Sequence, residues 1–132
     1  MQTVKTLIAD DDARFRQRVK ELLASEPDLE IIGEATDGYD VVCKARELQP
    51  DLVLMDVRMP QMSGLDAARQ LKAEMPQLKI IILTLYEIEE YQEAAKACGV
   101  DHFIVKRSML DDLMPAIRSI GQVTPVSRQQ CR

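Results

Sequence analysis

The chain has 132 residues, of which 46% are hydrophobic and 30% charged, and its 17 basic and 22 acidic side chains give a net charge of −5. These values are typical of one globular domain that buries a core without disulfides or structural metals. The acidic balance argues against direct nucleic-acid binding, which favours a basic face. No apolar run is long enough to span a membrane, and the N-terminus lacks the layout of a signal peptide, so we expect a cytoplasmic protein.

Five short apolar runs alternate with five segments of helical period. The runs, which we predict to be strands, are Thr6–Ala9, Leu29–Gly33, Leu52–Met55, Leu78–Leu83 and His102–Val105. In the segments that follow them, apolar residues recur every three or four positions, as on the buried face of a helix. This alternation predicts a parallel sheet covered on both faces. We therefore expect an α/β fold, a flavodoxin-like doubly wound (βα)5 three-layer sandwich with a parallel five-stranded sheet of order 2-1-3-4-5.

The predicted elements all lie in residues 1–121, which we expect to form one domain. The segment 122–132 is polar, and we expect it to be a C-terminal tail or linker. Three cysteines, Cys43, Cys98 and Cys131, lie far apart without a C-x-x-C motif. Their spacing predicts neither a disulfide framework nor a zinc site.

Polar residues follow four of the five predicted strands. They are Asp10 with Asp11, then Asp56, Thr84 and Lys106. In open α/β sheets the carboxyl ends of the strands meet at one edge, where ligands bind. In the predicted strand order the first and third strands are neighbours, so we expect Asp10 and Asp11 beside Asp56, with Thr84 and Lys106 on the far side.

Three carboxylates in one cleft repel one another unless positive charge lies between them. Lys106 supplies one charge, and a hard divalent cation with oxygen ligands, most plausibly Mg²⁺, would supply the rest. The same arrangement suits phosphoryl transfer to a carboxylate, because Mg²⁺, Lys106 and the Thr84 hydroxyl can each hold one phosphoryl oxygen. The product would be an aspartyl phosphate on Asp56.

As a set, these residues resemble the receiver domain of two-component response regulators, over about residues 4–121. The matching motifs are Asp10-Asp11, Asp56-Val57-Arg58-Met59-Pro60 with Gly64, Leu83-Thr84, and Val105-Lys106. The resemblance implies a signalling phosphoacceptor and not a metabolic enzyme. It would catalyse only its own phosphorylation on Asp56, from a sensor histidine kinase, and a slow autodephosphorylation.

The resemblance also implies roles for single residues. Asp11, Asp56 and the backbone carbonyl of Arg58 would hold Mg²⁺ or Mn²⁺ directly, and Asp10 would bind it through water. Thr84 would move toward the phosphoryl group while Phe103 turns inward, a switch that can lead to a homodimer. From the residues alone, an aromatic such as Phe103 in a strand of this sheet is more often part of the core, so its switch role rests on the resemblance.

In the family, two further positions tune the rate of dephosphorylation. They lie two residues after the phosphoacceptor and two after the hydroxyl residue, and are occupied here by Arg58 and Tyr86.

The segment after the last predicted strand resembles one branch of the family. Many receivers have a cis proline after the lysine, whereas this chain has Lys106-Arg107-Ser108, and a trans bond is expected there. This pattern resembles the branch with a LuxR-type helix-turn-helix output domain, which does not fit in the residues after Gly121. Two interpretations remain: a receiver from a longer DNA-binding regulator, or a stand-alone receiver that acts through protein contacts.

Other readings of the acidic residues are simpler or belong to other families. Asp10, Asp11 and Asp12 could together be a solvated N-cap of the first helix. Asp10 and Asp12 also fit the Asp-x-Asp of haloacid-dehalogenase-type phosphatases, although Ala13 and Arg14 follow and the late paired carboxylates of that family are missing. A flavodoxin would need a Ser/Thr/Gly-rich loop after the first strand, where this chain has aspartates that repel a phosphate.

Overall fold

Among the residues that the structure describes, five parallel strands form one sheet in the order β2-β1-β3-β4-β5. The computed structural model describes residues 3–130, and residues 121–130 by their backbone alone. The strands are β1 (Val4–Ala9), β2 (Leu29–Ala35), β3 (Leu52–Met55), β4 (Lys79–Thr84) and β5 (His102–Val105). The helices are α1 (Ala13–Leu23), α2 (Gly38–Leu48), α3 (Gly64–Glu74), α4 (Glu89–Ala97) and α5 (Met109–Gln130), with a 3-10 turn, η1 (Lys106–Ser108), before α5.

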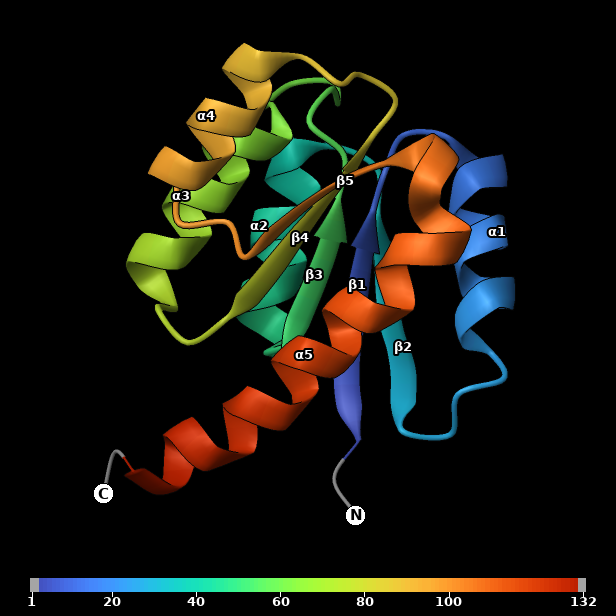
Figure 1. The fold of residues 1–132 in the computed structure, drawn as a ribbon. Helices are drawn as coiled ribbons and strands as arrows, with labels where there is room; N and C mark the ends of the chain where they lie inside the picture. Colours follow the sequence, from blue (N-terminus) through green and yellow to red (C-terminus); the bar gives the residue numbers. More distant parts are fainter. Residues whose placement is uncertain (1–2, 131–132) are drawn as a thin grey trace.

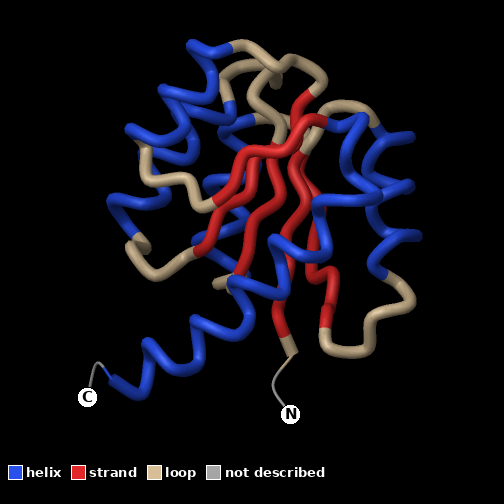
Figure 2. The backbone as a smooth tube through the Cα atoms, in the orientation of Figure 1, coloured by secondary structure: helices blue, strands red, loops and turns tan. Residues whose placement is uncertain are grey.

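Helices cover both faces of the sheet, so the molecule has three layers (Figures 1 and 2). Successive strand residues point to opposite faces. In β3, Val53 and Met55 therefore join the core under α2, α3 and α4, while Leu52 and Leu54 join the core under α1 and α5. All four are at most 1% exposed. The predicted fold class and strand order are confirmed.

The strand ends differ little from those predicted. β3 and β5 have the predicted bounds, and β1 begins two residues earlier, at Val4. β2 continues past Gly33 because it stays paired with β1 until Ala35 lies opposite Ala9. β4 is displaced by one residue, which makes Thr84 the last residue of the strand.

The C-terminal part of the chain is described as a continuation of α5. Its backbone is helical past Gly121 to Gln130, and residues 131–132 lie outside the described part. The expected division into a domain, 1–121, and a tail or linker, 122–132, stays a prediction. The trans bond after Lys106 is confirmed, since no described peptide bond is cis.

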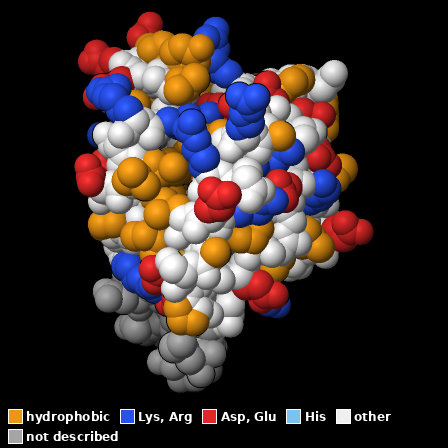
Figure 3. All heavy atoms as spheres, turned by 90° about the vertical axis from the view of Figure 1, so that its right-hand side faces the viewer, with side chains coloured by type: hydrophobic (Ala, Val, Ile, Leu, Met, Phe, Trp, Pro, Cys, Tyr) orange, Lys and Arg blue, Asp and Glu red, His pale blue; other side chains and the backbone are white. Residues whose placement is uncertain are grey.

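Helix length and surface charge bear on whether a chain can span a membrane or offer a charged binding face. None of the helices in residues 3–130 is long and apolar enough to cross a membrane. On the face in Figure 3, basic and acidic side chains lie mixed with apolar ones.

Gly64 begins α3 where the chain has no room for a side chain. A Cβ there would lie 1.9 Å from the carbonyl oxygen of Asp56. The Gly64 N–H donates to the Val57 carbonyl at 2.7 Å, which closes the loop after β3. Glycine is therefore required by the close approach of the Gly64 backbone to the carbonyl of Asp56.

We expect Gly64→Ala to lower the free energy of unfolding by about 3 kcal/mol, because the added methyl group meets rigid backbone. The matched control is Gly33→Ala, whose methyl group would meet the Cδ1 atom of the flexible Leu48 side chain at 2.8 Å. That change should cost less than about 1 kcal/mol. Urea unfolding of both variants measures these costs. Equal losses in the free energy of unfolding would show that the close approach to the Asp56 carbonyl does not exclude a side chain at position 64.

Candidate functional site

The carboxyl ends of β1 and β3 bring three carboxylates together. Ala9 and Met55, the last residues of these strands, lie opposite each other, and the Asp56 N–H donates to the Ala9 carbonyl at 3.0 Å. One carboxylate oxygen from each of Asp10, Asp11 and Asp56 lies within 4.8 Å of the other two. The predicted grouping of these residues is therefore confirmed.

Asp10 is the most constrained of the three. It is 2% exposed, and its N–H donates to the Ala35 carbonyl of β2 at 3.0 Å. Its Oδ1 accepts the Asp12 N–H at 2.9 Å, and its Oδ2 accepts from Lys106 at 2.7 Å. Both carboxylate oxygens thus already have partners within the protein.

Lys106 lies in direct contact with the acidic cluster. Its Nζ is 2.7 Å from Asp10 Oδ2 and 3.2 Å from Asp56 Oδ2, and its side chain is 8% exposed. The Phe15 ring packs against the ammonium, with 4.0 Å from Nζ to the ring centroid. The side chain, which starts at the end of β5, therefore reaches back to β1, closer to the carboxylates than the sequence predicted.

Burial shifts the pKa values of Asp10 and Lys106 in opposite directions. Burial raises the pKa of Asp10, and this effect exceeds the opposing effect of the bond from Lys106. Burial also lowers the pKa of Lys106, but the bond to Asp10 and the charge of Asp56 outweigh it, so the pKa of Lys106 lies above its ordinary value. The ammonium therefore stays charged, and Asp10 and Asp56 share its single positive charge.

The donor set fits a hard divalent cation. Three carboxylates offer oxygen ligands only, as Mg²⁺ and Mn²⁺ prefer. Within the described residues, no hydrogen bond or ion pair engages the exposed Asp11 carboxylate, which leaves it available to a metal. Asp12 differs: its carboxylate caps α1 by accepting the Arg14 and Phe15 N–H groups. The N-cap reading of the three aspartates therefore holds for Asp12 alone.

Thr84 and Phe103, the predicted switch residues, lie on neighbouring strands. Thr84 is fully buried, and its Oγ1 accepts the Tyr86 N–H at 3.4 Å. Phe103 is partly buried and packs against the core under α4 together with Tyr91. Core packing of Phe103 is thus confirmed, while its movement stays a prediction.

Arg58 and Tyr86 pair with each other beside the site. The Arg58 guanidinium lies over the Tyr86 ring, 4.7 Å from its centroid. A hollow of about 490 Å³ opens next to this pair. It is lined by Asp11, Val57, Arg58, Met59, Pro60, Ser63, Leu65 and Tyr91.

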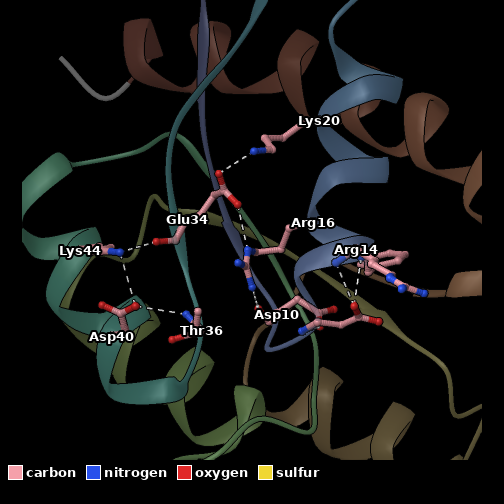
Figure 4. A network of polar contacts seen from close by, with 10 residues as sticks. Asp10, Arg14, Arg16, Lys20, Glu34, Thr36, Asp40 and Lys44 are labelled. Carbon is pink, nitrogen blue, oxygen red and sulfur yellow. Dashed lines mark hydrogen bonds and ion pairs between the residues drawn. The ribbon is translucent and has the colours of Figure 1, made fainter.

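A second set of polar residues supports the cluster and was not predicted from the sequence. Arg16 of α1 donates through Nη1 to the Asp10 carbonyl at 2.6 Å and through Nε to Glu34 of β2 at 2.8 Å (Figure 4). Lys20 also donates to Glu34, at 2.8 Å. For Arg16 and Lys20, the one sequence signal was their place on α1 beside the buried Phe15 and Val19. Charged residues at such positions resemble those of a solvated helix flank.

Comparisons with known proteins identify a family, a relative and solved structures that are similar to this chain. The model of the response regulator receiver domain matches residues 6–118. Response regulator protein VraR of Staphylococcus aureus is 36% identical over 120 residues, 91% of this chain and 57% of the relative. The chain therefore spans a little over half the length of this relative.

Two solved structures, 27% and 26% identical in sequence to this chain, have the same fold. A DNA-binding response regulator of the LuxR family from Staphylococcus aureus has a TM-score of 0.83 at 27% identity, covering 89% of this chain and 98% of that one. A LuxR-family two-component response regulator from Aurantimonas sp. SI85-9A1 has a TM-score of 0.85 at 26% identity, covering 90% and 85%. The resemblance to the LuxR branch is thus confirmed, and the chain belongs to the response regulator receiver domain family.

Proposed function

We propose that this receiver accepts a phosphoryl group on Asp56 in a Mg²⁺-dependent reaction and switches conformation to control an output. One observation carries the proposal: the Asp56 carboxylate lies among Lys106, 3.2 Å away, and the carboxylates of Asp10 and Asp11. An Asp56 oxygen attacks the phosphorus of a phosphohistidine on a sensor histidine kinase. The phosphorus–nitrogen bond breaks, and the histidine leaves with its electron pair.

Asp56 is a better nucleophile here than Asp10. Asp56 is 8% exposed, and the bond that its Oδ1 accepts from the Arg58 N–H is long, at 3.4 Å. Asp10 is more deeply buried, its pKa is raised by that burial, and two short bonds engage its oxygens. The phosphatase alternative is disfavoured for the same reason, and because Asp12 caps α1.

For the metal, we propose Asp11 and Asp56 as direct ligands with the Arg58 carbonyl, and Asp10 as a ligand through water. The available Asp11 carboxylate and the engaged oxygens of Asp10 support this division. When bound, the cation neutralises charge on the carboxylates and the incoming phosphoryl group. Lys106 then holds a second phosphoryl oxygen, and the Thr84 hydroxyl holds the third.

The switch starts at Thr84 in this proposal. Its Oγ1 accepts the Tyr86 N–H in a long bond, at 3.4 Å, while its own O–H group can donate to a phosphoryl oxygen. Movement of Thr84 leaves space into which Phe103 can turn, and such differential contacts bias a two-state equilibrium. The surface of α4, β5 and α5 would change with it and support a homodimer.

For the output, we propose control of transcription through a LuxR-type DNA-binding domain linked after residues 1–121 by the segment 122–132. The support is the DNA-binding response regulator of the LuxR family among the similar structures. A stand-alone receiver that acts through protein contacts is the alternative, and the reading frame after Arg132 decides between them. In either case the receiver itself would not contact nucleic acid.

The phosphoacceptor is tested with acetyl phosphate and Mg²⁺. We expect the parent chain to gain the mass of one phosphoryl group and Asp56→Asn to gain none. Asp12→Asn is the matched control, because asparagine also caps helices well, and its yield should equal that of the parent. An unchanged yield in Asp56→Asn would refute the assignment.

The metal ligands are tested by Mg²⁺ titration of two neighbouring variants. Asp11→Ala should weaken Mg²⁺ binding by more than about tenfold, since even residues behind the ligands contribute that much. Asp12→Ala should change the affinity less than about twofold while lowering the free energy of unfolding by about 1 kcal/mol, because it removes a helix cap. Equal losses of Mg²⁺ affinity in the two variants would show that the assignment of Asp11, and not Asp12, as the metal ligand is wrong.

The lifetime of the phosphoryl group is tested at Arg58 and Tyr86. The Arg58 guanidinium and the bulky Tyr86 ring shield the in-line approach of water, and Arg58 cannot accept a proton from that water. We therefore expect a long-lived phosphoryl group that decays faster in the double variant Arg58→Asn, Tyr86→Glu. Decay is followed after removal of the donor, with Arg69→Asn on the exposed face of α3 as the control. Decay of the double variant at the parent rate would mean that other groups limit water access.

A further inference from the structure

Arg16 holds the peptide group that joins two of the acidic residues. Its Nη1 donates at 2.6 Å to the carbonyl oxygen of Asp10, which belongs to the peptide between Asp10 and Asp11. The Arg16 side chain is 15% exposed, so water competes little for this bond. Because a peptide group is planar, holding its oxygen also sets the direction of the Asp11 N–Cα bond.

Asp11 depends on this peptide more than its neighbours do. Asp10 is held by Ala35, Asp12 and Lys106 through its N–H and both carboxylate oxygens, and Asp12 is held as the cap of α1. Within the described residues, no hydrogen bond or ion pair holds the Asp11 side chain. The surrounding protein therefore constrains Asp11 through its backbone, which sets the direction of the Cα–Cβ bond from which the carboxylate extends.

Glu34 fixes the guanidinium in turn. It accepts from Arg16 Nε at 2.8 Å and from Lys20 at 2.8 Å (Figure 4). The planar guanidinium can bind both Glu34 and the Asp10 carbonyl with different nitrogens, which an ammonium group cannot do in the same geometry. The bonds from Lys20 and Arg16 hold the pKa of Glu34 below its usual value, so Glu34 remains ionised and balances the charge of Arg16.

We propose that Arg16 is a positioning residue for the divalent cation: it holds the Asp10–Asp11 peptide so that the Asp11 carboxylate faces Asp56. This role rests on the proposed function, because it concerns the metal that phosphoryl transfer requires. Arg16 itself contacts neither the cation nor the phosphoryl group. It acts through Asp11, as residues behind metal ligands do when they orient them.

Positioning and charge predict opposite effects when Arg16 is removed. A guanidinium close to a metal site repels a cation, so a role through charge alone would make Mg²⁺ bind more tightly without it. A positioning role makes Mg²⁺ bind more weakly, because Asp11 then has to be ordered at the moment of binding. The sign of the change therefore separates the two roles.

The experiment is a Mg²⁺ titration of the unphosphorylated full chain, followed by calorimetry and by the amide NMR shifts of residues 10–12. Arg16→Met should weaken binding by about 10–100-fold, the range found for residues behind metal ligands. Lys20→Met is the matched control, because it also removes one ion pair of Glu34 but no bond to Asp10, and should change the affinity less than about twofold. Arg16→Lys should recover part of the affinity by donating to the Asp10 carbonyl.

The outcomes separate this role from the proposed function. A parent chain that does not respond to Mg²⁺ overturns the proposed function and this role with it. If the parent binds Mg²⁺, unchanged or tighter binding in Arg16→Met overturns this role alone, as does an equal loss in Lys20→Met. Urea unfolding without metal reports the stability of each variant. Should Arg16→Met not fold, Arg16→Lys is compared with Lys20→Met, and equal affinities in these two also overturn the role.

Discussion

The interaction on which this site depends is the ion pair of Lys106 with two buried carboxylates. The ammonium lies 2.7 Å from Asp10 and 3.2 Å from Asp56, and all three side chains are at most 10% exposed. Loss of one member of such a cluster would leave an unbalanced buried charge, a defect that costs about 3–5 kcal/mol. The same cluster links the ends of β5, β1 and β3. A change of charge at Asp56 would therefore alter the electrostatic interactions of Lys106 after β5 and of Asp10 after β1.

This arrangement explains how phosphorylation could act as a switch. A phosphoryl group on Asp56 would add negative charge and compete with Asp10 for Lys106. The burial that raises the pKa of Asp10 makes its carboxylate costly to leave without a cation. In the proposed function, the cation and Lys106 would therefore be shared between the carboxylates and the phosphoryl group.

Much of this could be predicted from the sequence because the signals are local. Short apolar runs that end at Asp10, Asp56, Thr84 or Lys106 identify both the strands and the polar residues at their ends, and parallel pairing brings those ends to one edge. Arg16 and Glu34 could not be found in this way. They are 18 residues apart, and a charged residue beside an apolar helical stripe has the same pattern whether it contacts water or a neighbouring strand.

The close contact of Lys106 with Asp10 could not be predicted from the sequence, for a related reason. Strand order places β5 at the edge of the sheet, two strands away from β3 and three from β1, and only the length and direction of the lysine side chain bring its ammonium to Asp10. The closed loop at Gly64 is a similar case, since the requirement for glycine comes from a carbonyl eight residues earlier.

The decisive measurement is a crystal structure of the chain with Mg²⁺ and beryllofluoride, a stable analogue of the phosphoryl group. We expect beryllium bonded to an Asp56 carboxylate oxygen, Lys106 Nζ in contact with a fluorine, and the cation bound by Asp11 and Asp56. Beryllofluoride on Asp10, or a cation bound without Asp11, would refute the proposed phosphoacceptor site.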